Sequence, residues 1–296
     1  MKLTYTIQPN DNFFNVKELL KLKFQISDRL LVKLKKNKKI WLNSTPTFVD
    51  SRLKPFDIVE ILIDFEEKSE NIIPTQIDLN IIYEDEYYIV INKPSGIAIH
   101  PSILHYTDSL ANGVKFYFEQ KNIKKKIRPI NRLDKDTSGL IIVAKNDKAH
   151  INMSEQIKER NVKKTYIALV RGNVPEEEAT INMPIGRSTK DRKKMAVTKN
   201  GKQAITHFKV LKRYSKYTLL EIKIETGRTH QIRVHMAEIG YPVVGDAVYS
   251  NGKNEFGIEG QMLHAYKLEF MHPITNKHME LTAPLPQYFE EILKKL

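Results

Sequence analysis

The stretch RLDKDTSGLIIVAK, residues 132–145, combines carboxylates, hydroxyls and a glycine at spacings that suit metal binding. Its two aspartates, serine and glycine match positions one, three, five and six of an EF-hand calcium loop. That loop needs a bidentate glutamate at position twelve, where this chain has Lys145. An EF-hand also lies between two helices, whereas the β-favouring LIIVA follows here. Asp134 and Asp136 are therefore either structural or act chemically without a metal.

Other familiar catalytic motifs are missing from the sequence. It has no glycine-rich phosphate loop, no H-E-x-x-H pair and no G-x-S-x-G nucleophile elbow. With no cysteine, it can form no disulfide, thiolate nucleophile or cysteine-ligated zinc site. His230 and His235 are five residues apart, which places them on different faces of a helix and disfavours a zinc pair. The chain is then an enzyme without nucleotide, metal or thiol, or a binding protein.

The charge of the chain favours a polyanionic partner. Its 48 Lys and Arg against 35 Asp and Glu give a net charge of +13, and part of the excess is concentrated in residues 33–39 and 187–202. Binding to phosphates releases condensed counterions, so such clusters attract nucleic acid. No apolar run approaches the roughly 18–20 residues that cross a bilayer, and the first residues lack a signal-peptide core. We therefore expect a cytoplasmic protein without a membrane partner.

The pattern of elements predicts two domains, residues 1–72 and 73–296. Residues 13–42 have the apolar spacing of two short helices followed by a strand, and the polar residues 66–76 indicate a linker. After it, strands and helices alternate without the regular βαβ order of a doubly wound sheet. This predicts an α+β domain with a mixed, largely antiparallel sheet and flanking helices.

The segment RTHQIRVHMAEIG is predicted to be a helix within that second domain. Ile232, Met236 and Ile239 follow helical spacing, Thr229 is a candidate N-cap, and Gly240 ends the pattern.

Four stretches occur in a fixed order along the second domain. From N- to C-terminus they are EDEYYIVINKPSGIAIHP, RLDKDTSGLIIVAK, KKTYIALVRG and TGRTHQIRVHMAEIGYPVVGD. Together they resemble the consecutive motifs of the RluA-type RNA pseudouridine synthases over residues 78–290. One departure is Asn131, where the family often has histidine. The resemblance implies a bent-sheet fold, and it implies isomerisation of uridine in RNA without a cofactor or a metal, because substrate and product are isomers.

The resemblance also assigns roles to individual residues. It makes Asp134 the essential carboxylate, as a nucleophile or as a base that abstracts a ribose proton. It places Arg233 as the partner of that carboxylate, and Tyr166 as a ring that stacks on the extruded uracil and handles a proton. Arg132 is expected to fill the gap that the extruded nucleotide leaves, and Arg228 to reach RNA or brace its loop.

Smaller expectations concern the surroundings of this site. Asp136, Thr137 and Ser138 are expected to cap the turn through their side chains. Lys93 and Pro94 are expected to be scaffold.

The first domain resembles the small alpha-L RNA-binding domain of a ribosomal protein and of several RNA-modifying enzymes, with a ubiquitin-like interaction module as the alternative. By this resemblance its RNA contacts come from the second helix and the turn after it, namely Lys33, Lys35, Lys36, Lys38 and Lys39.

The predicted partner of the whole chain is RNA, either ribosomal RNA or transfer RNA. Nothing in the sequence requires more than a monomer. The competing hypothesis is a non-catalytic RNA-binding or ribosome-assembly protein that retains the fold.

Overall fold

The chain divides into two units, Met1–Glu67 and Lys68–Leu296. The computed structural model describes residues 2–24, 26, 28–62, 72–102, 105–123, 125–189, 191, 194–251 and 256–296. Residues 66–71 of the predicted linker lie outside the described residues, and the linker and the predicted boundary after residue 72 both stay predictions. Within the described ranges, no helix is both long and apolar enough to span a membrane.

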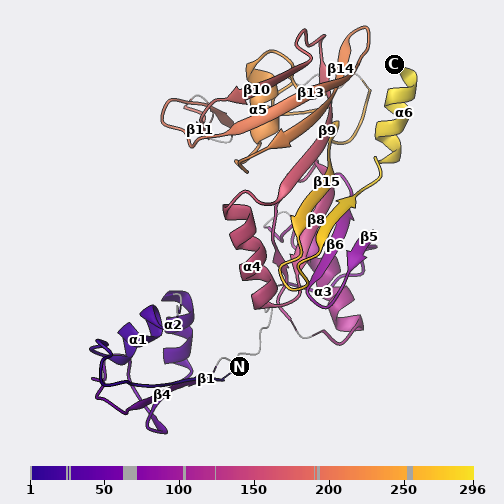
Figure 1. Ribbon diagram of the computed structural model, residues 1–296. Helices are drawn as coiled ribbons and strands as arrows, with labels where there is room; N and C mark the ends of the chain where they lie inside the picture. The colour runs from indigo at the N-terminus through magenta and orange to yellow at the C-terminus, as the bar shows by residue number, and fades with distance from the viewer. Residues whose placement is uncertain are drawn as a thin grey trace. The chain divides into compact units, whose positions relative to one another are not determined.

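A four-stranded antiparallel sheet and two helices form the first unit (Figure 1). Its elements are β1 (Lys2–Thr6), α1 (Val16–Leu22), α2 (Asp28–Lys36), β2 (Ile40–Leu42), β3 (Thr45–Pro46) and β4 (Ile58–Leu62). Asn15 caps α1 by accepting a hydrogen bond from the Glu18 amide at 3.0 Å. Leu19 and Leu20 of α1 pack against Ile61 of the sheet in the core of this unit. The two helices and the strand predicted over residues 13–42 are present.

The second unit is built on a ten-stranded sheet with the central order β10-β13-β14-β9-β15-β8-β6-β5; β16 pairs with β15 and β7 with β8. The strands are β5 (Ile81–Glu84), β6 (Tyr88–Lys93), β7 (Arg128–Pro129), β8 (Ser138–Ala144), β9 (Lys163–Arg171), β10 (Glu178–Asn182), β13 (Ile205–Arg213), β14 (Tyr217–Ile224), β15 (Leu263–Met271) and β16 (His278–Thr282). The remaining elements are the small hairpin β11 (Ile185–Arg187) and β12 (Met195–Val197), and the helices α3 (Leu110–Gln120), α4 (Asp147–Lys158), α5 (Gln231–Glu238) and α6 (Gln287–Lys295). All described pairings are antiparallel except that of β8 with β15, which confirms the predicted mixed, largely antiparallel α+β fold.

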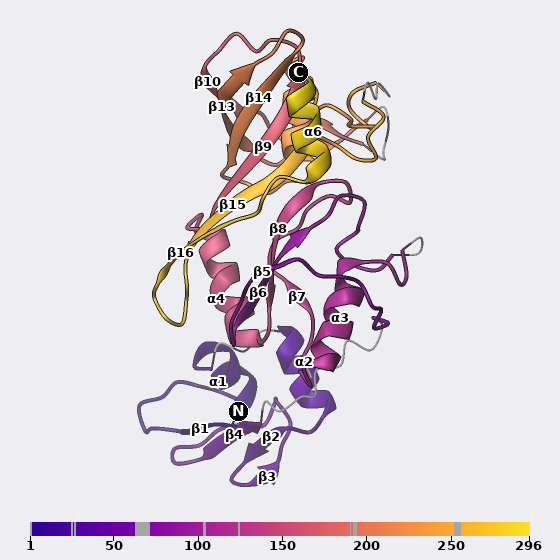
Figure 2. The ribbon, with the colours of Figure 1, turned by 90° about the vertical axis from the view of Figure 1, so that its right-hand side faces the viewer.

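Side chains alternate between the two faces of this sheet, and helices cover both faces. In β6, Ile89 and Ile91 join the apolar cluster that contains α3 and α5. Their neighbours Tyr88 and Val90 join the cluster that contains α4. Figure 2 shows α3 and α4 on opposite sides of the strands between them. Because helices cover both faces, a central strand of this sheet is buried along its whole length. All seven residues of β8 are buried, and its sequence continues as the apolar run LIIVA.

A glycine permits the close parallel approach of β8 to β15. Ser138 and Gly139 lie opposite His264 and Ala265. Gly139 has a φ of +112°, and a Cβ at this position would lie 2.3 Å from the Ala265 carbonyl oxygen, so no other residue fits. Ala265 is also the partner of Tyr166 on β9. The glycine thus sets the distance between the strand of Tyr166 and the loop that precedes β8.

Candidate active site

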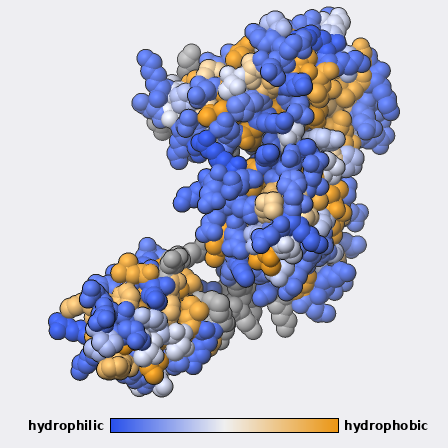
Figure 3. Space-filling model, in the orientation of Figure 1, coloured by the Kyte–Doolittle hydropathy of each residue, from blue (hydrophilic) through white to orange (hydrophobic). Residues whose placement is uncertain are grey.

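A cavity of about 1200 Å³ opens on the second unit. Its lining includes Asp134, Tyr166, Arg233, Arg132 and Arg228. Figure 3 shows hydrophilic residues bordering a hollow on this unit between the levels of α4 and α5. The structure thus brings together around one cavity five residues that lie up to about a hundred positions apart in the sequence, as the 99-residue separation of Asp134 and Arg233 illustrates.

The loop of Asp134, between β7 and β8, is held by a distant segment of the chain. The prediction that Thr137 and Ser138 cap the turn with their side chains is wrong. The Thr137 hydroxyl accepts a hydrogen bond from the Gln261 amide at 2.5 Å, and the Ser138 hydroxyl bonds His264 Nδ1 at 2.8 Å. The turn itself is closed by the backbone, where the Thr137 amide donates to the Asp134 carbonyl at 3.2 Å. Both hydroxyls therefore fasten the loop to the β15 region.

Lys93, at the end of β6, supports the same loop from the protein interior. Its side chain is fully buried, and its ammonium donates to three backbone carbonyls, including that of Lys135 in the loop at 2.8 Å. Burial lowers the pKa of Lys93 to about 7, while the charges of Asp136 and Asp134 act in the opposite direction. Ser95 adds a second support, because its hydroxyl donates to the Asp136 carbonyl at 2.8 Å. These contacts make residue 93 a structural brace of the site.

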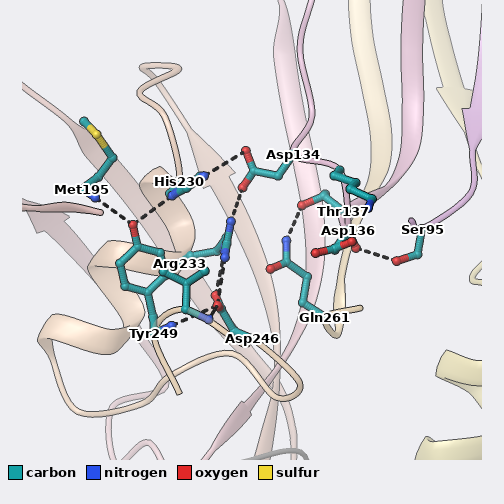
Figure 4. A network of polar contacts seen from close by, with 12 residues as sticks. Ser95, Asp134, Asp136, Thr137, Met195, His230, Arg233, Asp246, Tyr249 and Gln261 are labelled. Carbon is teal, nitrogen blue, oxygen red and sulfur yellow. Dashed lines mark hydrogen bonds and ion pairs between the residues drawn. The ribbon is translucent and has the colours of Figure 1, made fainter. Parts of the chain in front are cut away.

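Arg233 links two carboxylates (Figure 4). Its Nη1 donates to Asp134 Oδ2 at 2.8 Å, while Nε and Nη2 form a bidentate pair with the two oxygens of Asp246 at 2.6 and 2.9 Å. Burial opposes the charge of Arg233, but its bonds to Asp246 and Asp134 outweigh burial and raise its pKa above the ordinary value. Burial likewise opposes the charge of Asp246, and the bonds from Arg233 reverse the effect and lower its pKa. Arg233 is therefore a fixed cation at the floor of the cavity.

Two residues that sequence reasoning missed hold Arg233 in place. Asp246 is only 1% exposed, and its Oδ1 also accepts the backbone amides of Val248 and Tyr249 at 2.9 and 3.0 Å. The Tyr249 ring lies under the guanidinium of Arg233, 5.1 Å from centroid to Cζ. In the sequence, Asp246 is visible only as the aspartate that ends the stretch GYPVVGD. That position alone does not predict an ion pair with Arg233, thirteen residues earlier.

Helix α5 carries Arg233 and begins one residue later than predicted. The N-cap is His230, in the left-handed region with φ 56°, and not Thr229. No side chain caps this helix, and Gln231 instead fastens the segment that precedes it: its Oε1 accepts from the Thr226 hydroxyl at 2.7 Å and from the Arg228 amide at 3.0 Å. The left-handed residue turns the chain sharply into the helix, and this turn is set by tertiary contacts that no local pattern reports.

Tyr166 lies on β9 and is 6% exposed, in the same apolar cluster as α3 and α5. Burial, reinforced by the charge of Asp134, raises the pKa of Tyr166 well above its ordinary value, so the phenol keeps its proton at neutral pH. Within the described part of the chain its hydroxyl makes no hydrogen bond. The hydroxyl is thus protonated at neutral pH and has no hydrogen-bond partner among the described residues.

The two other predicted arginines at the cavity differ in their surroundings. Arg132 is exposed. Arg228 Nε donates to the Gln203 carbonyl at 2.9 Å, which braces its loop. Asn131, at the position where histidine was expected, bonds the backbone of β8: its amide donates to the Leu140 carbonyl and accepts the Ile142 amide, both at 2.9 Å. It therefore anchors the start of the loop and leaves Arg132 directed outward.

The predicted RNA-binding lysines belong to the first unit. Lys35, Lys36 and Lys38 are exposed on α2 and the turn after it, whereas Lys33 and Lys39 are partly buried. Lys35 and Lys36 lie in the last turn of α2, where positive charge also favours the helix dipole.

Comparisons with known proteins show the family to which this chain belongs. Residues 87–238 match the family model for RNA pseudouridylate synthase. The RNA pseudouridine synthase YlyB of Bacillus subtilis is 41% identical over 264 residues, which are 88% of this chain and 86% of that protein. Ribosomal large subunit pseudouridine synthase D of Pseudomonas aeruginosa is 38% identical over 86% of this chain and 85% of its own length.

A solved structure of a pseudouridylate synthase domain is also similar to this chain. Human RNA Pseudouridylate Synthase Domain Containing 1 superposes with a TM-score of 0.60 at 31% identity, covering 71% of this chain and 84% of that chain. The range matched by the family model contains Asp134, Tyr166 and Arg233, but ends before Asp246 and Tyr249.

Proposed function

Because this chain belongs to the RNA pseudouridylate synthase family, we propose that its cavity takes a uridine of structured ribosomal RNA and that Asp134 acts on that nucleotide. The observation that carries the proposal is the position of Asp134 at the cavity, 2.8 Å from a buried guanidinium and beside Tyr166. Relatives named for the ribosomal large subunit support ribosomal RNA as the substrate, with transfer RNA as the alternative.

The reaction rearranges atoms that the uridine already has. The bond from N1 of uracil to C1′ of ribose breaks, the base turns over, and a bond from C5 to C1′ forms. The hydrogen on C5 leaves and N1 gains one, so the atoms balance without a cofactor. Asp134 would attack the nucleotide or abstract a ribose proton. Arg233 would keep one carboxylate oxygen in place throughout, while its bidentate pair with Asp246 keeps Arg233 itself from moving.

Access to the uridine requires that it leave the RNA stack. Extrusion costs a few kcal/mol and costs least in a loop or bulge. Arg132 is exposed at the mouth of the cavity, where its guanidinium plane would stack in the place of the extruded base. Tyr166 would contact the uracil inside, with its hydroxyl near C5. The proposal needs only a monomer, acting in the cytoplasm.

The substrate can be identified in cells. Carbodiimide treatment and primer extension would map pseudouridines in RNA from cells with and without the gene. We expect one or a few stops in ribosomal RNA to disappear with the gene and to return with the wild-type gene but not with Asp134→Ala. Loss of stops in transfer RNA alone would replace the proposed substrate. Unchanged stops in every RNA would favour a non-catalytic RNA-binding or assembly role.

Replacing Tyr166 by phenylalanine tests the role of its hydroxyl. The ring and its burial remain, so RNA affinity should change little. The rate of a single turnover should fall by roughly 10²–10⁴-fold, the range for loss of a group that transfers a proton. Release of tritium from RNA labelled at C5 of uridine measures this rate.

Tyr214→Phe is the matched control, since Tyr214 lies outside the cavity lining and should keep the wild-type rate. A wild-type rate for Tyr166→Phe would show that the phenol only stacks.

We propose that the first unit binds RNA through α2 and the turn after it. Converting Lys35, Lys36 and Lys38 together to glutamine should weaken RNA binding, because phosphate contacts are lost. The slope of log affinity against log salt should flatten by roughly 2 to 3, at about 0.7–0.9 per phosphate contact. Fluorescence anisotropy at several salt concentrations measures both quantities.

A matched variant replaces three exposed lysines of the second unit, Lys209, Lys294 and Lys295, and should leave the slope nearly unchanged. If the two triple variants behave alike, α2 makes no specific contribution to RNA binding. The ubiquitin-like, protein-binding alternative would then be favoured for this unit.

A further inference from the structure

His230 lies between the proposed carboxylate and a tyrosine from another segment (Figure 4). Its Nδ1 is 2.9 Å from the Tyr249 hydroxyl, and its Nε2 is 3.9 Å from Asp134 Oδ1. Its backbone is left-handed, with φ 56°, a conformation that few non-glycine residues adopt and that often marks functional sites. The roles proposed for Asp134, Tyr166 and Arg233 leave this side chain without an assigned part in the reaction.

The hydrogen bonds of Tyr249 determine which imidazole nitrogen carries the proton. The Tyr249 hydroxyl oxygen accepts the backbone amide of Met195 at 3.0 Å. A phenol has a single O–H to donate, and among the described residues His230 Nδ1, at 2.9 Å, is the one acceptor in contact with the hydroxyl, so we assign the O–H to that bond. Nδ1 is then unprotonated, so in the neutral ring the proton lies on Nε2, the nitrogen that faces Asp134. In the opposite assignment the phenol oxygen would accept from both Met195 and Nδ1–H, and its own O–H would have no acceptor among the described residues.

The groups around His230 keep the ring neutral. Burial is the largest influence and lowers its pKa; Asp134 and Asp246 oppose this effect, and Arg233 and Arg132 reinforce it. These charges come from the loop before β8, from α5 and from the segment after α5, and Tyr249 is uncharged at neutral pH because burial raises its pKa.

We propose that His230 is a positioning residue, a neutral Nε2–H donor that closes onto Asp134 Oδ1 when the nucleotide enters. Arg233 already donates to Oδ2, so the two donors would hold the carboxylate from both sides. The separation of 3.9 Å is too long for a direct hydrogen bond, and contacts of this kind tighten in the substrate complex. This inference rests on the proposed function, because it assigns His230 a role through Asp134.

Tyr249 connects both donors. Its hydroxyl orients His230, and its ring face supports Arg233 at 5.1 Å. Tyr249→Phe separates these two effects, because it keeps the ring beneath the guanidinium and removes only the O–H that orients the imidazole. It is therefore the sharpest variant for testing the inference.

The tautomer can be observed without measuring activity. Long-range proton–nitrogen correlation spectra of the full chain with labelled histidine distinguish the two neutral forms and the charged form. The signal of His230 is assigned by its loss in His230→Asn, a change that suits the left-handed backbone. We expect an Nε2–H neutral ring in the wild type and a loss of this single form in Tyr249→Phe. A proton on Nδ1, or a charged ring at neutral pH, would overturn the inference.

Single-turnover rates provide the second readout. His230→Asn should slow the reaction by roughly 10- to 100-fold, the cost of a misplaced reacting group, with RNA affinity within about twofold of wild type. Tyr249→Phe should slow it less. The double variant should be no slower than His230→Asn, because the hydroxyl acts only through the imidazole.

Additive losses in the double variant would show that the Tyr249 hydroxyl acts independently of His230, and this would contradict the inference. A wild-type rate for His230→Asn would contradict it as well. A His230→Asn variant as inactive as Asp134→Ala would make His230 an essential participant and not a positioning residue. Turnover by Asp134→Ala would instead refute the proposed function itself, so the two failures can be told apart.

Discussion

Asp134→Ala is expected to bind RNA with nearly wild-type affinity and to lose isomerisation by at least about 10³-fold. The carboxylate is only 20% exposed and contributes little surface to an RNA contact, whereas the chemistry has no substitute for its oxygens. Asp134→Asn, which keeps the shape and removes the charge, should be equally inactive. Tritium release from C5-labelled RNA and a binding titration on the same preparations measure both effects.

Asp136→Asn is the matched control for this prediction. It removes the side-chain carboxylate two positions away in the same loop. The backbone carbonyl of residue 136, which accepts a hydrogen bond from Ser95, is left unchanged. We expect this variant to keep most of the wild-type rate. Sustained turnover by Asp134→Ala would refute the assignment of position 134, and a strong loss of RNA binding would show that the carboxylate shapes the RNA surface.

Arg233→Met is expected to lower the free energy of unfolding by about 3–5 kcal/mol as well as to abolish activity, because Asp246 would be left buried without a counter-charge. Arg233→Lys keeps a cation but cannot reproduce the three bonds of the guanidinium to two carboxylates. This variant should lose less stability and still lose about 10²-fold or more in rate. Urea unfolding and single-turnover kinetics provide the two readouts.

Adding Asp246→Asn to Arg233→Met separates fold from chemistry. The neutral amide removes the unpaired charge, so the double variant should regain part of the lost stability, a coupling that a double-mutant cycle measures. Its activity should not return, because Asp134 still lacks its donor. If Arg233→Lys reacts as fast as wild type, the bidentate geometry has no role in the reaction.

Local patterns were sufficient for most of the elements. The apolar run LIIVA became β8, and the periodic residues of the segment 229–241 became α5. They were insufficient at the ends of elements. Thr229 had the right side chain for an N-cap, but the position belongs to His230, whose left-handed backbone is stabilised by contacts with Tyr249 and the segment around it. Hydroxyls next to a turn were likewise misread, because Thr137 and Ser138 bond partners more than a hundred positions away.

By itself, the sequence determined the family, the α+β class and the positions of the proposed carboxylate, tyrosine and arginine, because these depend on residue types in a fixed order. Only the tertiary structure decided how the carboxylate is held. The pairing of Arg233 with Asp246, the support of both by Tyr249 and the contact of the Tyr249 hydroxyl with His230 Nδ1 arise from side chains that converge from separate segments. Hydrogen-bond geometry depends on distances of a few tenths of an ångström between such segments, and spacing along a chain carries no information at that scale.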